Sequence, residues 1–165
     1  MDAQTTRGAT APSTGEVDEI ARETGAMEIL DAEQCWELLG SVEVGRLAIA
    51  VAGDVDIFPV NFALDDGSIV FRTAEGTKLV EIVLAGRVAF EVDGYEPEHG
   101  RAWSVVVKGR ADNLERFEDL YRAQALPLFP WNAAPKERFV RLRPERLTGR
   151  RFTVLGTRTG EAPQL

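Results

Sequence analysis

The fold of this chain is decided by Ile69-Val-Phe-Arg-Thr-Ala-Glu-Gly-Thr-Lys78, which is followed by the apolar-periodic residues Leu79 to Ala85. β-Branched and aromatic residues alternate over 69–73, as they do in a half-buried strand. Over 77–84 the large apolar residues are spaced for one face of a helix. Ala74-Glu-Gly76 must turn the chain between the two. The stretch therefore predicts a strand, a short turn and a helix that begins at Thr77.

The start of this predicted helix has the composition of an anion site. The first turn of a helix carries unpaired backbone N–H groups and a partial positive charge. Further donors surround that point: Arg72, Thr73, Thr77 and Lys78. Such a place suits a phosphate group. An ordinary strand-turn-helix with solvated charges is equally compatible with these residues.

The composition is that of one globular domain. The chain has 165 residues, of which 44% are hydrophobic and 28% are charged, and it has no apolar run as long as a membrane span. A formal net charge of −8 argues against general nucleic-acid binding, which needs cations to neutralise phosphates. Because no secretory or transit segment is recognisable before Ile29, we expect a cytoplasmic protein. The single Cys35 is expected to be a buried, inert thiol.

We expect three regions along the chain. Residues 1–25 are rich in small and acidic residues and predict a flexible N-terminal tail. Residues 26–156 form the folded domain, and 157–165 a C-terminal tail. Within the domain, Asp31 and Gln34 form a capping pattern that starts a helix over 32–39.

The remaining pattern predicts a small barrel, mainly β with some α. Pro59 cannot donate to a ladder and indicates an edge, a bulge or an interrupted pairing within its strand. Asp65-Asp-Gly67 predicts a hairpin. A second helix over 114–125 is expected to bury an apolar stripe. The predicted strands, six or seven in a closed or nearly closed barrel, cover 44–52, 56–64, 68–73, 87–93, 102–111, 139–143 and 147–154.

The residues offer no constellation for side-chain catalysis. His99, the only histidine, is expected to be solvated in a loop, so no triad and no histidine metal site is predicted. No dinucleotide fingerprint of the G-x-G-x-x-G type is present. Arginines do gather late in the chain. They are expected either to be solvated on a strand pair or to point, one or two of them, into a phosphate or carboxylate pocket: Arg138, Arg141, Arg143, Arg146, Arg150 and Arg151.

Several stretches taken together resemble a known family. They are Phe58-Pro-Val-Asn-Phe62, Asp65-Asp-Gly-Ser68, the stretch 69–78, Val88–Asp93, Trp103–Arg110 and Leu147-Thr-Gly-Arg150. The combination resembles the FMN-binding split-barrel superfamily, specifically the pyridoxamine-5′-phosphate-oxidase-like proteins common in actinobacteria, over about Ile29 to Leu155. The resemblance implies a six- to seven-stranded antiparallel split β-barrel with short flanking helices. It also implies a homodimer with FMN at the subunit interface.

The resemblance also implies roles for individual residues. It places the FMN phosphate at Arg72, Thr73, Thr77 and Lys78, and the isoalloxazine ring beside Pro59, Val60, Asn61 and Phe62. Ser104 matches a polar flavin-contacting position, and either Arg150 or Arg151 is expected to reach the flavin of the other subunit. Trp131 is expected to cover the pocket or to plug the surface, and Trp103 to wall the pocket or to pack in the core or interface.

Two departures from the family pattern affect the predicted reaction. Asn61 stands where the vitamin-metabolising oxidases often place a lysine. The C-terminal Arg-Leu-His-Asp-Arg-like signature of those oxidases is also missing. We therefore expect a flavin-dependent oxidoreductase with another small-molecule substrate, in which the flavin performs the redox chemistry. The alternatives are a deazaflavin-dependent reductase and a non-catalytic module that binds or senses a flavin.

Overall fold

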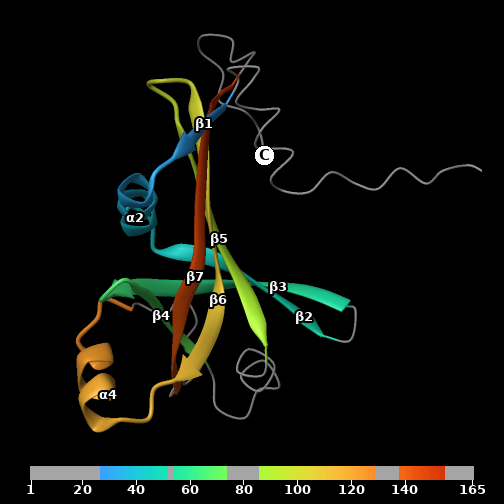
Figure 1. The fold of residues 1–165 in the computed structure, drawn as a ribbon. Coiled ribbons are helices and arrows are strands. Elements are labelled where there is room, and N and C mark those ends of the chain that lie inside the picture. The colour runs from blue at the N-terminus through green and yellow to red at the C-terminus, as the bar shows by residue number, and fades with distance from the viewer. Residues whose placement is uncertain (1–26, 52–53, 74–85, 129–137, 155–165) are drawn as a thin grey trace, which may run out of the picture.

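The computed structural model describes residues 27–51, 54–73, 86–128 and 138–154. The described elements follow one another as β1 (Met27–Leu30), α2 (Ala32–Gly40), β2 (Val44–Val51), β3 (Asp54–Asp65), β4 (Ser68–Thr73), β5 (Arg87–Glu96), β6 (Arg101–Asn113), α4 (Phe117–Gln124) and β7 (Arg138–Thr153). Figure 1 shows α4 near the start of β7 and β1 near its end. The predicted mainly-β chain with short flanking helices is confirmed.

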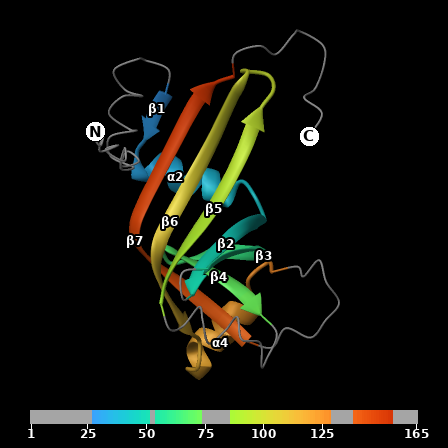
Figure 2. The ribbon, with the colours of Figure 1, turned by 90° about the vertical axis from the view of Figure 1, so that its right-hand side faces the viewer.

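The strands form a ring of the split-barrel type. Their order is β1-β7-β4-β3-β2-β5-β6, and an additional pairing of β7 with β6 completes the ring. Every pairing is antiparallel, and β5, β6 and β7 lie side by side in Figure 2. On its other edge, β7 pairs with β4 through 138–142 and with β1 through 149–152. The expected split barrel is therefore confirmed.

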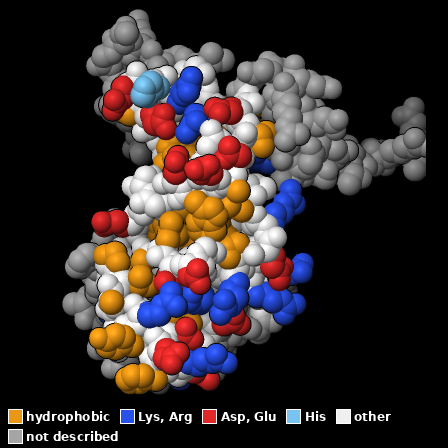
Figure 3. Space-filling model, turned by 60° about the vertical axis from the view of Figure 1, so that its left-hand side comes forward, with side chains coloured by type: hydrophobic (Ala, Val, Ile, Leu, Met, Phe, Trp, Pro, Cys, Tyr) orange, Lys and Arg blue, Asp and Glu red, His pale blue; other side chains and the backbone are white. Residues whose placement is uncertain are grey.

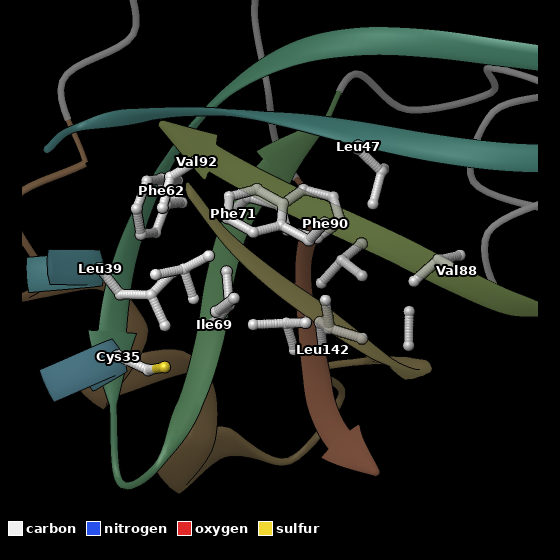
Figure 4. Packing of buried hydrophobic residues seen from close by; sticks show 14 of the residues in the cluster. Cys35, Leu39, Leu47, Phe62, Ile69, Phe71, Val88, Phe90, Val92 and Leu142 are labelled. Atoms are coloured by element: carbon white, nitrogen blue, oxygen red, sulfur yellow. The ribbon is translucent and has the colours of Figure 1, made fainter. Parts of the chain in front are cut away.

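The core fills the inside of this ring. Alternation along the strands turns Leu47 and Ile49 inward, and both are buried. Phe62 packs edge-on against Phe90, with ring centroids 4.9 Å apart and an interplanar angle of 71°. In Figure 4, Cys35 reaches from α2 into the same cluster. Its burial raises the pKa of the thiol, and the charge of Asp31 raises it further, which agrees with the expected inert cysteine.

Local sequence signals place the first helix and the first hairpin. The backbone N–H of Gln34 donates to Asp31 Oδ1, and the backbone N–H of Asp31 donates to Gln34 Oε1, each over 2.9 Å. This is the predicted capping box. Asp66 and Gly67 have φ values of 49° and 65°, as a two-residue hairpin turn requires. The turn sets the register of β3 against β4.

The last two predicted strands are one continuous strand, so their division at Pro144 was wrong. β7 runs through Pro144, which lies opposite Gly109 of β6, beside a shift in register between Lys108 and Gly109. Proline has no N–H to donate to a ladder. The shift in register accommodates Pro144, so the strand continues through it. The strand predicted over 87–93 was also too short. β5 continues to Glu96, and His99 lies in the turn with its side chain exposed, as expected.

The prediction that the apolar stripe of the second helix is buried holds for Leu114 and Leu120 but was wrong for Phe117 and Tyr121. The helix begins only at Phe117, because Leu114 is held at the end of the preceding strand, where its N–H donates to the carbonyl of Phe139. The helix then packs through Leu120 and Ala123. Because the helix turns Leu120 and Ala123 toward the barrel, Phe117 is 82% exposed to solvent and Tyr121 is 70% exposed.

Replacing Gly109 with alanine is expected to destabilise the barrel. A Cβ at this position would lie 2.0 Å from the carbonyl oxygen of Arg143, so backbone must move. We expect the free energy of unfolding to fall by about 1–3 kcal/mol, measured by urea denaturation. Gly40→Ala is the matched control, because its Cβ would lie 3.7 Å from Leu64 Cδ1, an ordinary contact. Equal stability of the two variants would contradict the steric argument.

The described surface carries intermixed charge. On the face in Figure 3, acidic and basic side chains alternate around a central apolar patch. Among the described helices, none is long and apolar enough to cross a membrane.

Candidate functional site

The site predicted for the ring lies where β3 and β4 separate. Their ladder joins Phe62–Asp65 to Ser68–Phe71, so Asn61 and Arg72 are the first residues beyond it. Pro59 lies opposite Arg46 of β2, and no ladder pair with β4 is formed at Pro59 in the described ranges. The edge predicted from Pro59 is therefore present.

Side chains at this fork point alternately into and out of the barrel. Phe62 is buried in the core, and Val60 packs against the same cluster, so alternation turns Pro59 and Asn61 outward. Any contact of Phe62 with a ring outside the barrel must use its backbone. On β4, Thr73 is buried and shares the inward face of Phe71, whereas Arg72 points outward. Arg72 and Thr73 thus lie on opposite faces, and Thr77 and Lys78 are outside the described residues.

Arg72 has the features of an anion-binding side chain. Its guanidinium carbon lies 4.9 Å from the centroid of the Phe139 ring, an arrangement typical of a cation–π contact. Its Nε is buried, and no hydrogen-bond partner for it is found within the described structure. Buried donors are normally satisfied, so this atom fits a ligand that brings an acceptor. A phosphate oxygen is such an acceptor.

A pocket of about 300 Å³ lies beside Arg72. It is bounded by β4, β7 and α4, and the residues that line it are Arg72, Ala123, Gln124, Leu126, Leu128 and Phe139. This pocket was not predicted, because its walls come from segments far apart in the chain.

Ser104 and Arg150 form a second group. They lie directly opposite each other on β6 and β7, and Asp93 of β5 is the other neighbour of Ser104. Arg151 points to the opposite face, where its Nη1 lies 3.5 Å from Glu28 Oε2 and its Nε lies 4.0 Å from Glu96 Oε1. Alternation therefore makes Arg150 the arginine that shares a face with Ser104.

Of the two tryptophans predicted near the pocket, the structure describes only Trp103. Trp103 is 6% exposed and belongs to the barrel core. A Cβ on Gly94 would lie 2.4 Å from its ring, so glycine is needed there for the two strands to fit. This burial agrees with the core interpretation of Trp103. Trp131 lies outside the described residues.

The two groups are far apart along β7 but nearer to each other across the outer face. Arg72 is paired with Phe139 on β7, and Arg150 lies eleven residues further along the same strand. A strand rises about 3.3 Å per residue, so the separation along β7 is about 35 Å. In the other direction around the ring, Pro59 is paired with Arg46 of β2, β2 pairs with β5, and Asp93 of β5 is paired with Ser104. Three strand-to-strand steps therefore separate the ring site from Ser104.

A charged cluster on the outer face was missed by the sequence reasoning. Arg46 Nη1 donates to Glu91 Oε2 over 2.9 Å and also bonds Asp93 Oδ1. Burial raises the pKa of Glu91, and the hydrogen bond from Arg46 opposes this rise. The available signal was alternation, because Arg46 precedes the inward Leu47. The cluster lies between Pro59 and Ser104 on the sheet.

A second cluster fixes α4 on the barrel. Asp65 Oδ2 accepts from Arg141 Nη2 over 2.6 Å, and Asp65 Oδ1 accepts from Arg122 Nη2 over 2.9 Å. Arg141 Nη1 also donates to Ser68 Oγ over 3.0 Å. Arg141 thus binds a carboxylate of its own chain. Because Arg122 belongs to α4, Asp65 positions the helix that bounds the pocket.

The described part of the fork presents groups that suit the binding of a ligand. Within the described ranges, no three histidine, cysteine, aspartate or glutamate side chains are grouped to hold a metal. The fork offers a backbone edge, an outward amide at Asn61 and a cation at Arg72. Such a set can hold a ring with polar edges and an attached phosphate.

The chain is similar to several known proteins. A FAD-binding protein of Mycobacterium smegmatis is 41% identical, covers 75% of this chain and 97% of its own, and superposes with a TM-score of 0.67. A FAD-binding protein of Mesorhizobium loti is 28% identical. The match covers 76% of this chain and 96% of that protein, and the TM-score is 0.67. The Mycobacterium tuberculosis protein Rv0080, itself uncharacterised, is 35% identical over 76% of this chain and 85% of its own.

The family model described as pyridoxamine 5′-phosphate oxidase matches residues 31–151. This match includes the fork of β3 and β4 and reaches Arg150 and Arg151 at the end of β7. The chain belongs to the pyridoxamine 5′-phosphate oxidase-like family of split-barrel proteins.

Proposed function

We propose that this protein binds a flavin nucleotide and acts as a flavin-dependent oxidoreductase on a small-molecule substrate. The observation that carries the proposal is Arg72, whose buried Nε has no hydrogen-bond partner in the described ranges and which lies at the fork beside Asn61. In this proposal the ring lies against Pro59–Phe62. The phosphate is held by Arg72 with Thr77 and Lys78, whereas the inward side chain of Thr73 does not take part.

FMN is the smallest nucleotide that has both the ring and the phosphate. FAD contains the same two parts and is the second candidate, because the relatives from M. smegmatis and M. loti are described as FAD-binding. A bound flavin would supply the redox chemistry. The part of this chain is to hold the phosphate with the Arg72 cation and to orient the ring through the β3 edge.

The proposal includes a homodimer in which two chains complete each site. In this proposal the fork of one subunit would face Ser104 and Arg150 of the other. The outer face of β3 supports such an interface, since Val55 is 65% and Ile57 63% exposed. Exposed apolar residues next to a site are typical of a covered surface. A two-fold dimer would use this face twice.

Flavin binding and dimerisation are expected to be linked. A ligand that contacts both chains stabilises the dimer by mass action. Apo protein should therefore dissociate at higher protein concentrations than flavin-loaded protein in sedimentation over a dilution series. Ile57→Asp should shift both curves toward monomer, and Tyr121→Ala, another exposed apolar residue, should shift neither. A monomer with full flavin affinity would contradict the shared site.

Identification of the bound molecule tests the proposed function. Protein purified without added cofactor is denatured, and the released ligand is examined by absorbance and mass spectrometry. FMN or FAD supports the proposal, whereas a deazaflavin would indicate the deazaflavin-dependent reductase. Turnover with reduced nicotinamides then separates an enzyme from a flavin-binding or sensing module. Oxidation of pyridoxamine phosphate is not proposed, because Asn61 replaces the family lysine.

A further inference from the structure

We propose that the pocket between β4, β7 and α4 receives the adenylate arm of FAD, so that the flavin site extends beyond the first phosphate. The inference rests on the proposed flavin site at Arg72. The pocket has a volume of about 300 Å³, at the lower end of the range for ligand sites. It therefore suits one part of a nucleotide rather than a whole flavin.

The order of the strands places this pocket on the far side of the phosphate from the ring. On the outer face, Asn61 of β3, Arg72 of β4 and Phe139 of β7 follow one another across the sheet. Neighbouring strands are about 4.8 Å apart. A ligand with its ring over β3 and its phosphate at Arg72 continues, if it is longer than FMN, over Phe139 and toward α4.

The walls of the pocket match an adenine ring. One face of the Arg72 guanidinium lies over the ring of Phe139, which is itself buried, and the other face is a flat surface of the kind on which bases stack. Leu126 and Leu128 add apolar walls. Gln124 supplies an amide, whose donor and acceptor pair is suited to the N6 and N7 edge of adenine.

The same arginine also fits the link between the two halves of FAD. The face of its guanidinium can stack while its edge donates, and the buried Nε has no hydrogen-bond partner in the part of the chain described. A pyrophosphate places acceptors on both sides of such an edge. The opposite wall is fixed, because Arg122, two residues before Gln124, is bonded to Asp65.

Equilibrium titration of the apo protein with FMN, FAD and riboflavin tests the inference, with adenosine as a competitor that has no phosphate to bind Arg72. We expect FAD to bind at least about tenfold more tightly than FMN, and adenosine to compete with FAD but not with FMN. Gln124→Ala should reduce the preference for FAD about two- to tenfold, the worth of one hydrogen bond, and should leave FMN affinity unchanged. Tyr121→Ala is the matched control on α4, because Tyr121 is exposed outside the pocket.

Three results would overturn the inference. Equal affinity for FMN and FAD in the wild type would show that the arm makes no favourable contact. An unchanged preference in Gln124→Ala, or an equal loss for FMN and FAD, would show that the arm does not lie in this pocket. Absence of binding by FMN, FAD and riboflavin alike would instead contradict the proposed flavin site itself.

Discussion

Replacing both Arg72 and Lys78 with alanine is expected to weaken FMN binding by about 100- to 10,000-fold. Charge-assisted hydrogen bonds are each worth about 1.5–3 kcal/mol, and each 1.4 kcal/mol corresponds to a tenfold change in affinity. Two such groups on one phosphate account for the expected range. The measurement is titration of apo protein, followed by quenching of flavin fluorescence.

Riboflavin distinguishes loss of the phosphate site from general damage. It has no phosphate, so it should bind the wild type much more weakly than FMN and lose little further affinity in the double variant. Arg143→Ala is the matched control, since this exposed arginine of β7 bonds Asp112 away from the fork. FMN affinity unchanged in the double variant would remove the phosphate from 72–78.

Much of the fold could be predicted because its signals are local. Alternation along 44–51 identifies the buried face of β2, the Asp31 and Gln34 pair starts α2, and the Asp66-Gly67 turn joins β3 to β4. Each depends on residues within a few positions of one another. The number and spacing of the strands indicated a closed or nearly closed barrel, whereas its split form came from the resemblance to a family, since pairing of β7 with β4 and β6 leaves no local pattern.

The candidate site was predicted as a set of residues but not as an arrangement. Alternation shows that Arg72 and Thr73 point to opposite faces, yet the family pattern groups them. The phase of α4 could not be predicted, because Leu114 lies at the end of β6 rather than in the helix. The contact between Asp65 and Arg141 was not predictable either, since it joins residues brought together only by the pairing of β4 with β7.

Replacing Asp65 with alanine is expected to lower the free energy of unfolding by about 3–5 kcal/mol. The Arg141 side chain is 6% exposed, so the variant leaves a buried guanidinium without its carboxylate. It also releases Arg122 and with it the position of α4. Urea denaturation measures the loss. Asp112→Ala is the matched control, because it removes an exposed pair with Arg143 that is worth at most about 1 kcal/mol.

The same carboxylate should make stability depend on pH. Burial alone raises the pKa of Asp65, but the hydrogen bonds and charges of Arg141 and Arg122 outweigh it and lower the pKa below its ordinary value, about 3.9 in an unfolded chain. The stabilisation is therefore complete above about pH 4 and is lost as the pH falls through the lower, folded-state pKa. The difference in free energy of unfolding between wild type and Asp65→Asn should be constant above about pH 4 and should decrease as the pH falls below it. A difference in stability that stays constant on acidification, or an Asp65→Ala variant as stable as Asp112→Ala, would show that the pair of Asp65 and Arg141 does not stabilise the fold.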